Sequence, residues 1–249
     1  MTSPDRPGYA EHMDMRGLSA AAAPAFAQQA LLTCAKDLPK PVDQLDVLDL
    51  GSGYGFTAAE LASVCRSAVG MEPTAELHSE SLALLADHPN LQFVHAGTEG
   101  LDAVEEYDLI VLDNVYEHLP NQADALRRIH RALRPGGVLY LLMPNRLWPR
   151  EVHYGLPFLS WLPLPAANRY LRWSGRGEDY TDASYARTYP TMRRALAKHD
   201  WDWRFTLPAD PTATHLGTPL HYRVGMAVIR KVPAAWAISK SFMVVAKKR

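Results

Sequence analysis

The sequence predicts an α/β protein with a Rossmann-like, three-layer arrangement, in which helices cover both faces of a mostly parallel sheet. Short apolar segments alternate with amphipathic ones between residues 45 and 143, and a glycine-rich turn joins the first strand to the helix after it. The chain has 249 residues, and 47% of them are hydrophobic, which is enough to bury both faces of a full sheet. Such alternation implies parallel strands joined by right-handed crossovers.

The expected elements follow from hydrophobic periodicity and from the residues that end helices. An alanine-rich amphipathic helix is predicted over residues 17–38, and Pro39 and Pro41 end it. Strands and helices then alternate, with strands at 45–50, 67–71, 91–95, 107–113 and 137–143 and helices at 55–65, 74–87 and 121–133. The RPGG segment at 134–137 ends the last of these helices and turns the chain into the next strand.

The simple alternation stops after Pro144. Segment 146–185 is dense in Trp, Tyr, Pro and Arg and is too long for a plain connection; a helix at 187–199 and a strand at 202–207 follow, then segment 208–238 and a last strand at 241–247. Open α/β sheets bind ligands at the carboxyl ends of their strands, so we expect 146–185 and 208–238 to form an acceptor-binding lid. Alternatively, the apolar LPFLSWLPLP stretch serves a dimer interface or a membrane surface.

Composition excludes several classes of partner. The net charge is −1, which argues against an extended nucleic acid, and the four arginines at 127, 128, 131 and 134 suit the solvated face of one helix. Two cysteines are too few for a disulfide framework, and no apolar run reaches the roughly 20 residues of a membrane span. The polar residues 1–16 read as an arm or a flap over the ligand. We therefore expect one domain over residues 1–249, located in the cytoplasm.

The stretch DVLDLGSGYGFTAAELA, residues 46–62, is the most informative motif. Glycines at 51, 53 and 55 allow a sharp turn and a close approach of the backbone to a ligand. No Lys-Ser/Thr pair follows, as a P-loop requires, and the glycine spacing differs from the dinucleotide fingerprint. Glu72 ends the next strand, where a carboxylate can accept two ribose hydroxyls. The ligand therefore carries a ribose and needs no pyrophosphate.

Four segments, DLGSGYG, GMEP, YDLIVLDNVYEHLP and LRPGGVLYLLMPN, resemble in order the motifs of class I S-adenosylmethionine-dependent methyltransferases of the type 11/12-like superfamily. The resemblance covers roughly residues 45–145, and SFMVVAKK is similar to the family's last strand. It implies a seven-stranded sheet with the last strand antiparallel, S-adenosylmethionine as cofactor, and 45–145 as the cofactor-binding core. A Rossmann-like domain that binds another nucleotide is the alternative.

Family position and strand geometry imply cofactor roles for ten residues. Asp49 braces the glycine turn or reaches the methionine amino group, Glu72 takes the ribose hydroxyls, and Asp113 borders the sulfonium unless it only caps the following turn. Asn114 also borders the sulfonium, and Gly51, Ser52 and Gly53 lie along the methionine and ribose. Met71 or Pro73 packs near the adenine, and Thr98 or Glu99 reaches its amino group, where family members usually carry an acidic residue.

Acceptor chemistry is expected from two groups that emerge at the carboxyl ends of neighbouring strands. Methyl transfer to an amine or thiol needs little beyond positioning, whereas a hydroxyl needs a general base or a metal. Candidate catalytic residues are His118, Glu151 and His153. The pattern Asn114-x-x-Glu117-His118 with a later histidine also resembles the magnesium site of small-RNA 2′-O-methyltransferases and, more loosely, of ubiquinone-pathway O-methyltransferases, with Asn114 in place of the first acid. It implies Glu117, His118 and His153 as ligands of Mg²⁺; alternatively, His118 only braces its helix.

Three functional hypotheses follow. The leading one is O-methylation of a small or carbohydrate-like hydroxyl acceptor, assisted by a histidine base or a divalent metal. The second is metal-independent N- or O-methylation of an aromatic or amine metabolite, and a metal chelator distinguishes the two. The third is a cofactor-binding subunit without transfer activity.

Overall fold

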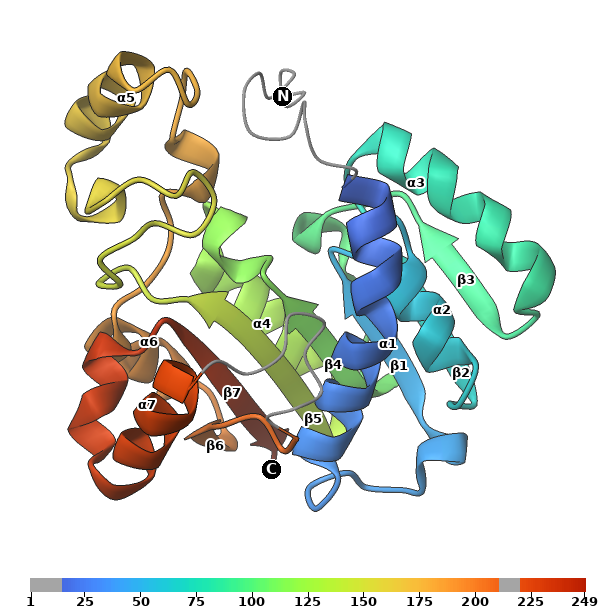
Figure 1. Ribbon diagram of the computed structural model, residues 1–249. Helices are drawn as coiled ribbons and strands as arrows, with labels where there is room; N and C mark the ends of the chain where they lie inside the picture. The colour runs from blue at the N-terminus through green and yellow to red at the C-terminus, as the bar shows by residue number, and fades with distance from the viewer. Residues whose placement is uncertain (1–14, 211–219) are drawn as a thin grey trace.

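A seven-stranded sheet forms the centre of the protein in a computed structural model that describes residues 15–210 and 220–249. The strand order is β3-β2-β1-β4-β5-β7-β6 (Figure 1). Strands β1 to β5 pair in parallel, and β7 is antiparallel to both of its neighbours, so the predicted sheet and its antiparallel last strand are confirmed. The strands are β1 (Asp46–Leu50), β2 (Ser67–Met71), β3 (Leu91–Val94), β4 (Tyr107–Asp113), β5 (Leu133–Pro144), β6 (Trp201–Thr206) and β7 (Ser241–Lys248).

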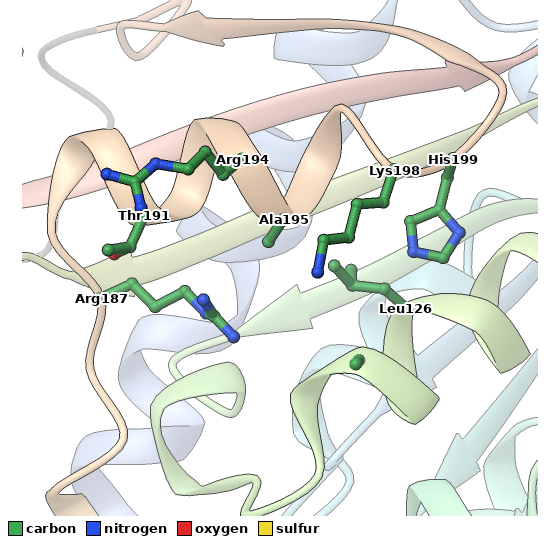
Figure 2. A pocket seen from close by; sticks show the side chains of 8 residues that line it. Leu126, Arg187, Thr191, Arg194, Ala195, Lys198 and His199 are labelled. Atoms are coloured by element: carbon green, nitrogen blue, oxygen red, sulfur yellow. The ribbon is translucent and has the colours of Figure 1, made fainter.

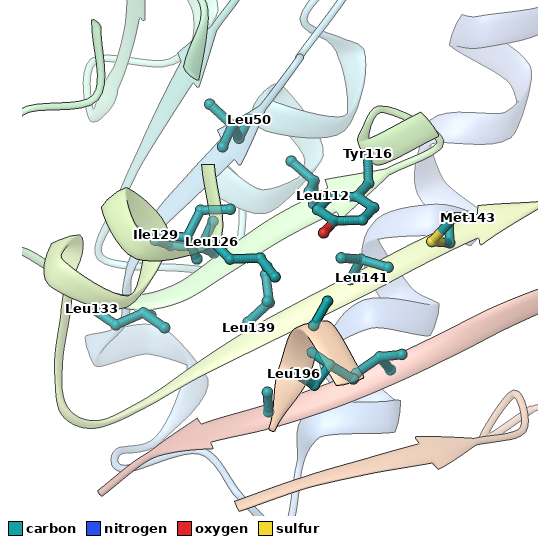
Figure 3. Packing of buried hydrophobic residues seen from close by; sticks show 14 of the residues in the cluster. Leu50, Leu112, Tyr116, Leu126, Ile129, Leu133, Leu139, Leu141, Met143 and Leu196 are labelled. Atoms are coloured by element: carbon teal, nitrogen blue, oxygen red, sulfur yellow. The ribbon is translucent and has the colours of Figure 1, made fainter. Parts of the chain in front are cut away.

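Helices cover both faces of this sheet because successive strand residues point to opposite sides. On one face, Val47 and Val111 pack with α1 (Met15–Cys34) and α2 (Phe56–Ala62). On the other, Leu48 and Leu112 pack with α4 (Gln122–Ala132) and α6 (Tyr189–Leu196) (Figure 3). A further helix, α3 (Ala75–Ser81), leads to the 3₁₀ turn Leu82–Asp87 and then to β3. The predicted three-layer arrangement is therefore present.

The N-terminal helix and the fifth strand differ in length from their predictions. Helix α1 ends at Cys34 and not at 38, because the Asp37 and Leu38 N–H groups both donate to the Cys34 carbonyl and turn the chain. The Asp37 carboxylate then accepts two hydrogen bonds from Arg204 on β6. Strand β5 already begins at Leu133 and shifts register against β4 across the proline–glycine turn, so its pairing extends further than the apolar run alone.

The two long segments, 146–185 and 208–238, were expected to be helical or loop insertions, and each contains a helix whose position the sequence did not predict. The first holds α5 (Leu164–Trp173), which lies beyond the carboxyl end of β5 (Figure 1). It has its own small core of Leu156, Leu159, Ala167, Leu171, Tyr180 and Ala183. The second holds α7 (Leu220–Lys231). This segment contributes Ile229 and Trp236 to the main core, which is the hydrophobic cluster between the sheet and helices α4 and α6. The Asn145 amide joins the two segments at their bases by donating to the Ala237 and Ser239 carbonyls.

Two expectations fall on parts of the chain that are not described. The N-terminal arm, expected over 1–16, lies outside the described residues up to position 14, and the middle of the second long segment, 211–219, also lies outside them. Among the helices that the structure does describe, none has the length and apolar character needed to cross a membrane.

Candidate functional site at the carboxyl ends of the strands

The glycine turn after β1 adopts a conformation that favours glycine. Gly51, Gly53 and Gly55 have φ angles of 81°, 54° and 81°. A Cβ added at Gly51 would lie 2.4 Å from the Val115 side chain, and one at Gly55 would lie 2.5 Å from the Phe93 ring. A Cβ at Gly53 would meet no atom within 4 Å. Two of the glycines are thus required by packing, whereas Gly53 borders open space that a ligand can occupy.

Glu72 fixes the turn in place. Its buried carboxylate accepts the Gly53 N–H at 2.8 Å and the Thr74 N–H at 2.9 Å. The Gly51 and Ser52 N–H groups bond to the Met71 carbonyl at 2.8 and 3.1 Å. The Met71 side chain packs into the main core, so Met71 contacts the turn through its backbone. The predicted neighbours are therefore brought together, with each Glu72 oxygen retaining a further lone pair for a ligand.

Three acidic groups lie close together at this edge, and the part of the chain that the structure describes gives them no basic partner. Asp49 is buried, and its Oδ2 has no hydrogen-bond partner among the described residues. Burial, together with the charges of Asp113 and Glu72, raises the pKa of Asp49 to about 7. Burial and the Glu117 charge raise the pKa of Asp113 to about 7, although the Asn114 amide donates to its Oδ1 at 2.7 Å. Such a group of carboxylates suits a cationic ligand.

The residues predicted to border the adenine lie in the 3₁₀ turn Thr98–Gly100 that follows β3. Thr98 is half-buried, whereas the Glu99 side chain is exposed. Asn114 adopts a left-handed conformation with φ 53° directly after β4. Asn114 therefore follows β4, which pairs with β1, whereas Thr98 and Glu99 follow β3, which is separated from β1 by β2.

On the acceptor side, Glu117, His118 and His153 converge. Glu117 and His118 lie in the 3₁₀ turn Tyr116–His118 after β4, and His153 lies in the loop after β5. One ligand atom from each residue falls within 4.8 Å of the others. Glu117 Oε1 is 3.9 Å from His118 Nε2 and 3.8 Å from His153 Nε2. The structure thus assembles the three residues that the sequence predicted to act together.

Both histidines are held through their Nδ1 atoms. His153 Nδ1 lies 2.7 Å from Glu151 Oε1, and the same buried carboxylate accepts the His153 and Tyr154 N–H groups. His118 Nδ1 lies 3.0 Å from the Asp182 carbonyl oxygen. Because Nδ1 donates in each case, Nε2 is left as an acceptor facing Glu117. Glu151, predicted as catalytic, therefore positions His153.

Burial dominates the electrostatics of the carboxylate at the centre. Glu117 is fully buried, neither of its oxygens has a hydrogen-bond partner among the described residues, and burial raises the pKa of its carboxyl. Burial opposes the charged form of His118, but the hydrogen bonds that His118 donates to Asp182 and the Glu117 charge outweigh it, so the pKa of His118 is raised. Among the described residues, histidines are the only ion-pair partners of Glu117 and Glu151. The cluster is therefore acidic and lacks a permanent cation.

Sequence reasoning missed Asp182 and the cavities beside α6. Asp182 holds His118 Nδ1 through its backbone oxygen at 3.0 Å, and its carboxylate Oδ2 lies 3.6 Å from the same nitrogen, but the two residues are 64 positions apart in the sequence. One cavity of about 230 Å³ lies between α4 and α6, with Arg187, Arg194 and Lys198 around it (Figure 2). A second, of about 450 Å³, adjoins it and includes Arg146. Neither is lined by the glycine turn or by Glu117, His118 or His153.

Comparison with known proteins identifies the family to which the chain belongs. A family model described as a methyltransferase domain matches residues 18–204. The arsenite methyltransferase of Aquipseudomonas alcaligenes is 34% identical over 142 residues, which cover 49% of this chain and 41% of that protein. A ubiquinone biosynthesis O-methyltransferase of Rhizobium etli is 26% identical over 145 residues, covering 56% and 53%. The chain spans about half the length of the curated relatives it matches.

Solved structures show the same fold. The YcgJ protein of Bacillus subtilis superposes with a TM-score of 0.58 at 16% identity, covering 89% of this chain and 99% of that one. The plantazolicin methyltransferase BamL, solved with a triazolic desmethylPZN analog and SAH, gives a TM-score of 0.58 at 13% identity, covering 96% and 92%. The predicted Rossmann-like fold is thereby confirmed.

Proposed function

The chain belongs to the class I S-adenosylmethionine-dependent methyltransferases, and we propose that it transfers a methyl group to a hydroxyl oxygen of a small or carbohydrate-like acceptor. The observation that carries this proposal is the convergence of Glu117, His118 and His153 beside the strand ends that hold the glycine turn. A hydroxyl is the acceptor that needs such help, because an unactivated alcohol is a poor nucleophile.

The residues of the turn fit the cofactor. S-adenosylmethionine supplies a methyl group on a positively charged sulfur, and it also carries an ammonium group and a ribose. The open space beside Gly53 admits it, and the carboxylates of Asp49 and Asp113 offer negative charge without a basic partner. Glu72 is the proposed acceptor of the ribose hydroxyls. The remaining proposed contacts are those of Gly51, Ser52, Thr98, Glu99 and Asn114.

His153 is the proposed base. Its Nδ1 is engaged by Glu151 at 2.7 Å, so its Nε2 is free to take a proton from an acceptor hydroxyl. His118 has the same arrangement with the Asp182 carbonyl. The same atoms can instead bind a divalent cation that lowers the pKa of the hydroxyl. Mg²⁺ fits poorly because it prefers an octahedral shell of oxygen atoms, whereas two of the three donors are nitrogen.

Aromatic side chains of the first long segment support a carbohydrate or planar acceptor. Phe158, Trp161 and Trp173 expose 49%, 48% and 84% of their surface, far more than buried packing requires. Aromatic faces stack on sugar rings and on planar metabolites alike. The second candidate function is metal-independent methylation of an aromatic or amine metabolite. Such a metabolite would contact the same exposed aromatic side chains, and its methylation would need no metal.

Cofactor binding and transfer are tested separately. Calorimetric titration with S-adenosylmethionine and S-adenosylhomocysteine should give micromolar affinities, and a labelled-methyl screen against sugars, phenols and amines should give transfer to hydroxyl compounds. Binding with transfer only to amines would replace the proposal by the second candidate. No binding to folded protein would overturn the cofactor assignment, and binding without transfer to any class would favour a subunit without activity.

A further inference from the structure

We propose that Glu117, His118 and His153 form a binding site for a first-row transition-metal ion of borderline softness, Zn²⁺ being the representative, and that the site discriminates against Mg²⁺. The catalytic use of this ion rests on the proposed function, but its binding does not. The proposal is argued from three features of the cluster: a buried carboxylate without a partner, two histidines oriented toward it, and a donor set dominated by nitrogen.

The Glu117 carboxylate requires a cation. It is 0% accessible, and neither of its oxygens has a hydrogen-bond partner among the described residues. An ionised carboxylate buried in this way is costly unless it is paired or coordinates a metal. The two Nε2 atoms that face it stand 3.8 and 3.9 Å away, beyond hydrogen-bond distance, and each is left as an acceptor because its ring donates through Nδ1. The space between these atoms is therefore the place for a bound ion.

The two histidines have the orientation of metal ligands. A ligating histidine generally donates its other ring N–H to a carboxylate or a carbonyl, which fixes the tautomer and the ring. His153 does so to the Glu151 carboxylate at 2.7 Å, and His118 does so to the Asp182 carbonyl at 3.0 Å. The rings meet edge to face with centroids 5.0 Å apart, and both Nε2 atoms lie within 4 Å of Glu117 Oε1. Each histidine thus already has its outer partner.

The separations allow coordination after a small contraction. Zinc–ligand distances of about 2.0–2.2 Å place the donors of a tetrahedral set about 3.4 Å apart. The two measured separations, 3.8 and 3.9 Å, exceed this value by about 0.5 Å. His118 and His153 lie in a turn and a loop and are only partly buried, so side-chain rotations of this size need no rearrangement of the sheet.

The donor types select the ion. Two imidazoles and one carboxylate match the protein ligands of His₂Glu zinc sites and of 2-His-1-carboxylate iron sites, both of which keep open positions. A magnesium site would need more oxygen ligands. Asn114, which stands where a second acid would be needed, donates its amide to Asp113 at 2.7 Å. This cluster therefore offers three suitable ligands to a transition metal. To Mg²⁺ it offers one carboxylate, that of Glu117, as the preferred oxygen ligand.

An ion with an open position explains why the cluster lies at the acceptor side. A hydroxyl bound to such an ion has a lowered pKa and releases its proton to solvent water near neutral pH. The oxygen then keeps the electron pair that it needs as a nucleophile. In this arrangement His153 is a ligand and not the base, and Glu151 positions it through Nδ1.

The test measures metal binding directly. The full chain, freed of metal by a chelator, is titrated calorimetrically with Zn²⁺, Co²⁺ and Mg²⁺, and the Co²⁺ complex is followed by its visible absorption. We expect one Zn²⁺ per chain with an affinity at least about a hundredfold above that for Mg²⁺. His118→Ala and His153→Ala should each weaken Zn²⁺ binding by about tenfold to a hundredfold or more.

Matched controls separate this site from others. His130→Ala removes a histidine that also lies near a second one, His199, with ring centroids 5.9 Å apart but with its Nε2 on the Asp200 carbonyl. Zn²⁺ affinity should be unchanged in this variant. Glu151→Gln should weaken binding less than loss of a ligand does. Circular dichroism and S-adenosylmethionine affinity, measured on every sample, report folding and cofactor binding independently of metal.

Each outcome decides the proposal. Stoichiometric Zn²⁺ binding that falls in His118→Ala and His153→Ala but not in His130→Ala supports it. Zn²⁺ binding no tighter than that of Mg²⁺, or unchanged in both variants, overturns it and leaves the cluster as a histidine–glutamate pair without metal. Loss of S-adenosylmethionine binding with intact Zn²⁺ binding would instead overturn the proposed function and leave the metal site standing.

Discussion

The proposed cofactor half and the proposed acceptor half of the site are built in different ways. In the cofactor half, residues 49–55 with Glu72, backbone N–H groups of two neighbouring strand ends are tied to one carboxylate and one carbonyl. In the acceptor half, residues 117–118 and 151–153, side chains from separate segments are held by Glu151 and by the Asp182 carbonyl. The geometry of the cofactor half therefore depends on the sheet. The geometry of the acceptor half depends on how segment 146–185 folds over the sheet.

This difference predicts how each half fails. A change in the cofactor half should remove cofactor binding, because the backbone of the turn is held by hydrogen bonds to Glu72 and Met71 and borders the space proposed for the ligand. A change in the acceptor half should leave cofactor binding intact and act on transfer, because its residues do not support the turn. The predictions below test this separation in order of decreasing effect.

The largest effect is expected for Gly53→Ala. Its Cβ would enter the open space beside the turn, so S-adenosylmethionine affinity should fall by about a hundredfold or more, or beyond detection, whereas alanine at φ 54° costs only about 1 kcal/mol of folding free energy. Calorimetry and thermal unfolding measure the two effects. Normal cofactor affinity in this variant would place the ligand elsewhere.

Gly51→Ala is the matched control, because an added Cβ at this position would clash with a neighbouring side chain and would not enter the proposed ligand space. Its Cβ would lie 2.4 Å from Val115, so the variant should lose more folding free energy than Gly53→Ala does. Equal destabilisation of the two variants would mean that Gly53 is also required by the fold.

His153→Ala should have the next largest effect, and on turnover alone. Loss of a base or of a metal ligand at this position should lower turnover by about a hundredfold or more, with S-adenosylmethionine affinity within about twofold of the original. Steady-state kinetics and calorimetry on the same preparation measure both. A fall in cofactor affinity as large as the fall in turnover would break the separation between the halves.

The contrast also explains what the sequence could predict. The glycine turn is contiguous and Glu72 follows the next strand, so the order of residues alone predicted the proposed cofactor half. Glu151 and His153 were predicted because they follow a strand at the edge where ligands bind. The anchoring of His118 by Asp182, 64 residues later, was not predictable, because it depends on the path of the intervening segment.

A different reason applies to the helices that were missed. Helix α5 is only 10 residues long and has a helical apolar period, but it begins within the proline-rich stretch LPFLSWLPLP, which hides its start. Helix α7 follows the segment 211–219, in which turn residues obscure any start signal. The sheet, in contrast, is specified by long apolar runs. Successive residues of a strand point to opposite faces, and both faces are buried in a hydrophobic core, so every position of such a run is apolar.

Cofactor affinity should rise with pH. For each proton that the protein releases on binding the cofactor, the rise is at most about tenfold per pH unit. Asp49 and Asp113 have pKa values raised from 3.8 to about 7, so the folded protein holds protons that the unfolded chain releases between those values. Stability without ligand is therefore greatest below pH 4 with respect to these two groups and falls as the pH rises through 7. A cationic ligand favours their ionised forms, so binding strengthens over the same window.

Calorimetry between pH 5.5 and 8.5 measures this dependence. S-adenosylhomocysteine, whose sulfur is neutral, should show a weaker rise than S-adenosylmethionine, and Asp49→Asn should flatten the curve for both. Affinities for both ligands that do not change with pH would mean that the two carboxylates do not face the bound cofactor.

The smallest effect is expected for Glu99→Gln, which tests the outer edge of the cofactor half. Glu99 is exposed, so water screens its charge and the substitution should change S-adenosylmethionine affinity by less than about threefold. Glu72→Gln, at a carboxylate with 6% exposure that also holds two backbone N–H groups, should cost clearly more. Calorimetry on the two variants compares them directly. If Glu99→Gln proved the more damaging, the adenine end and not the ribose end would dominate binding, and the rigid turn would position the ligand without supplying most of its affinity.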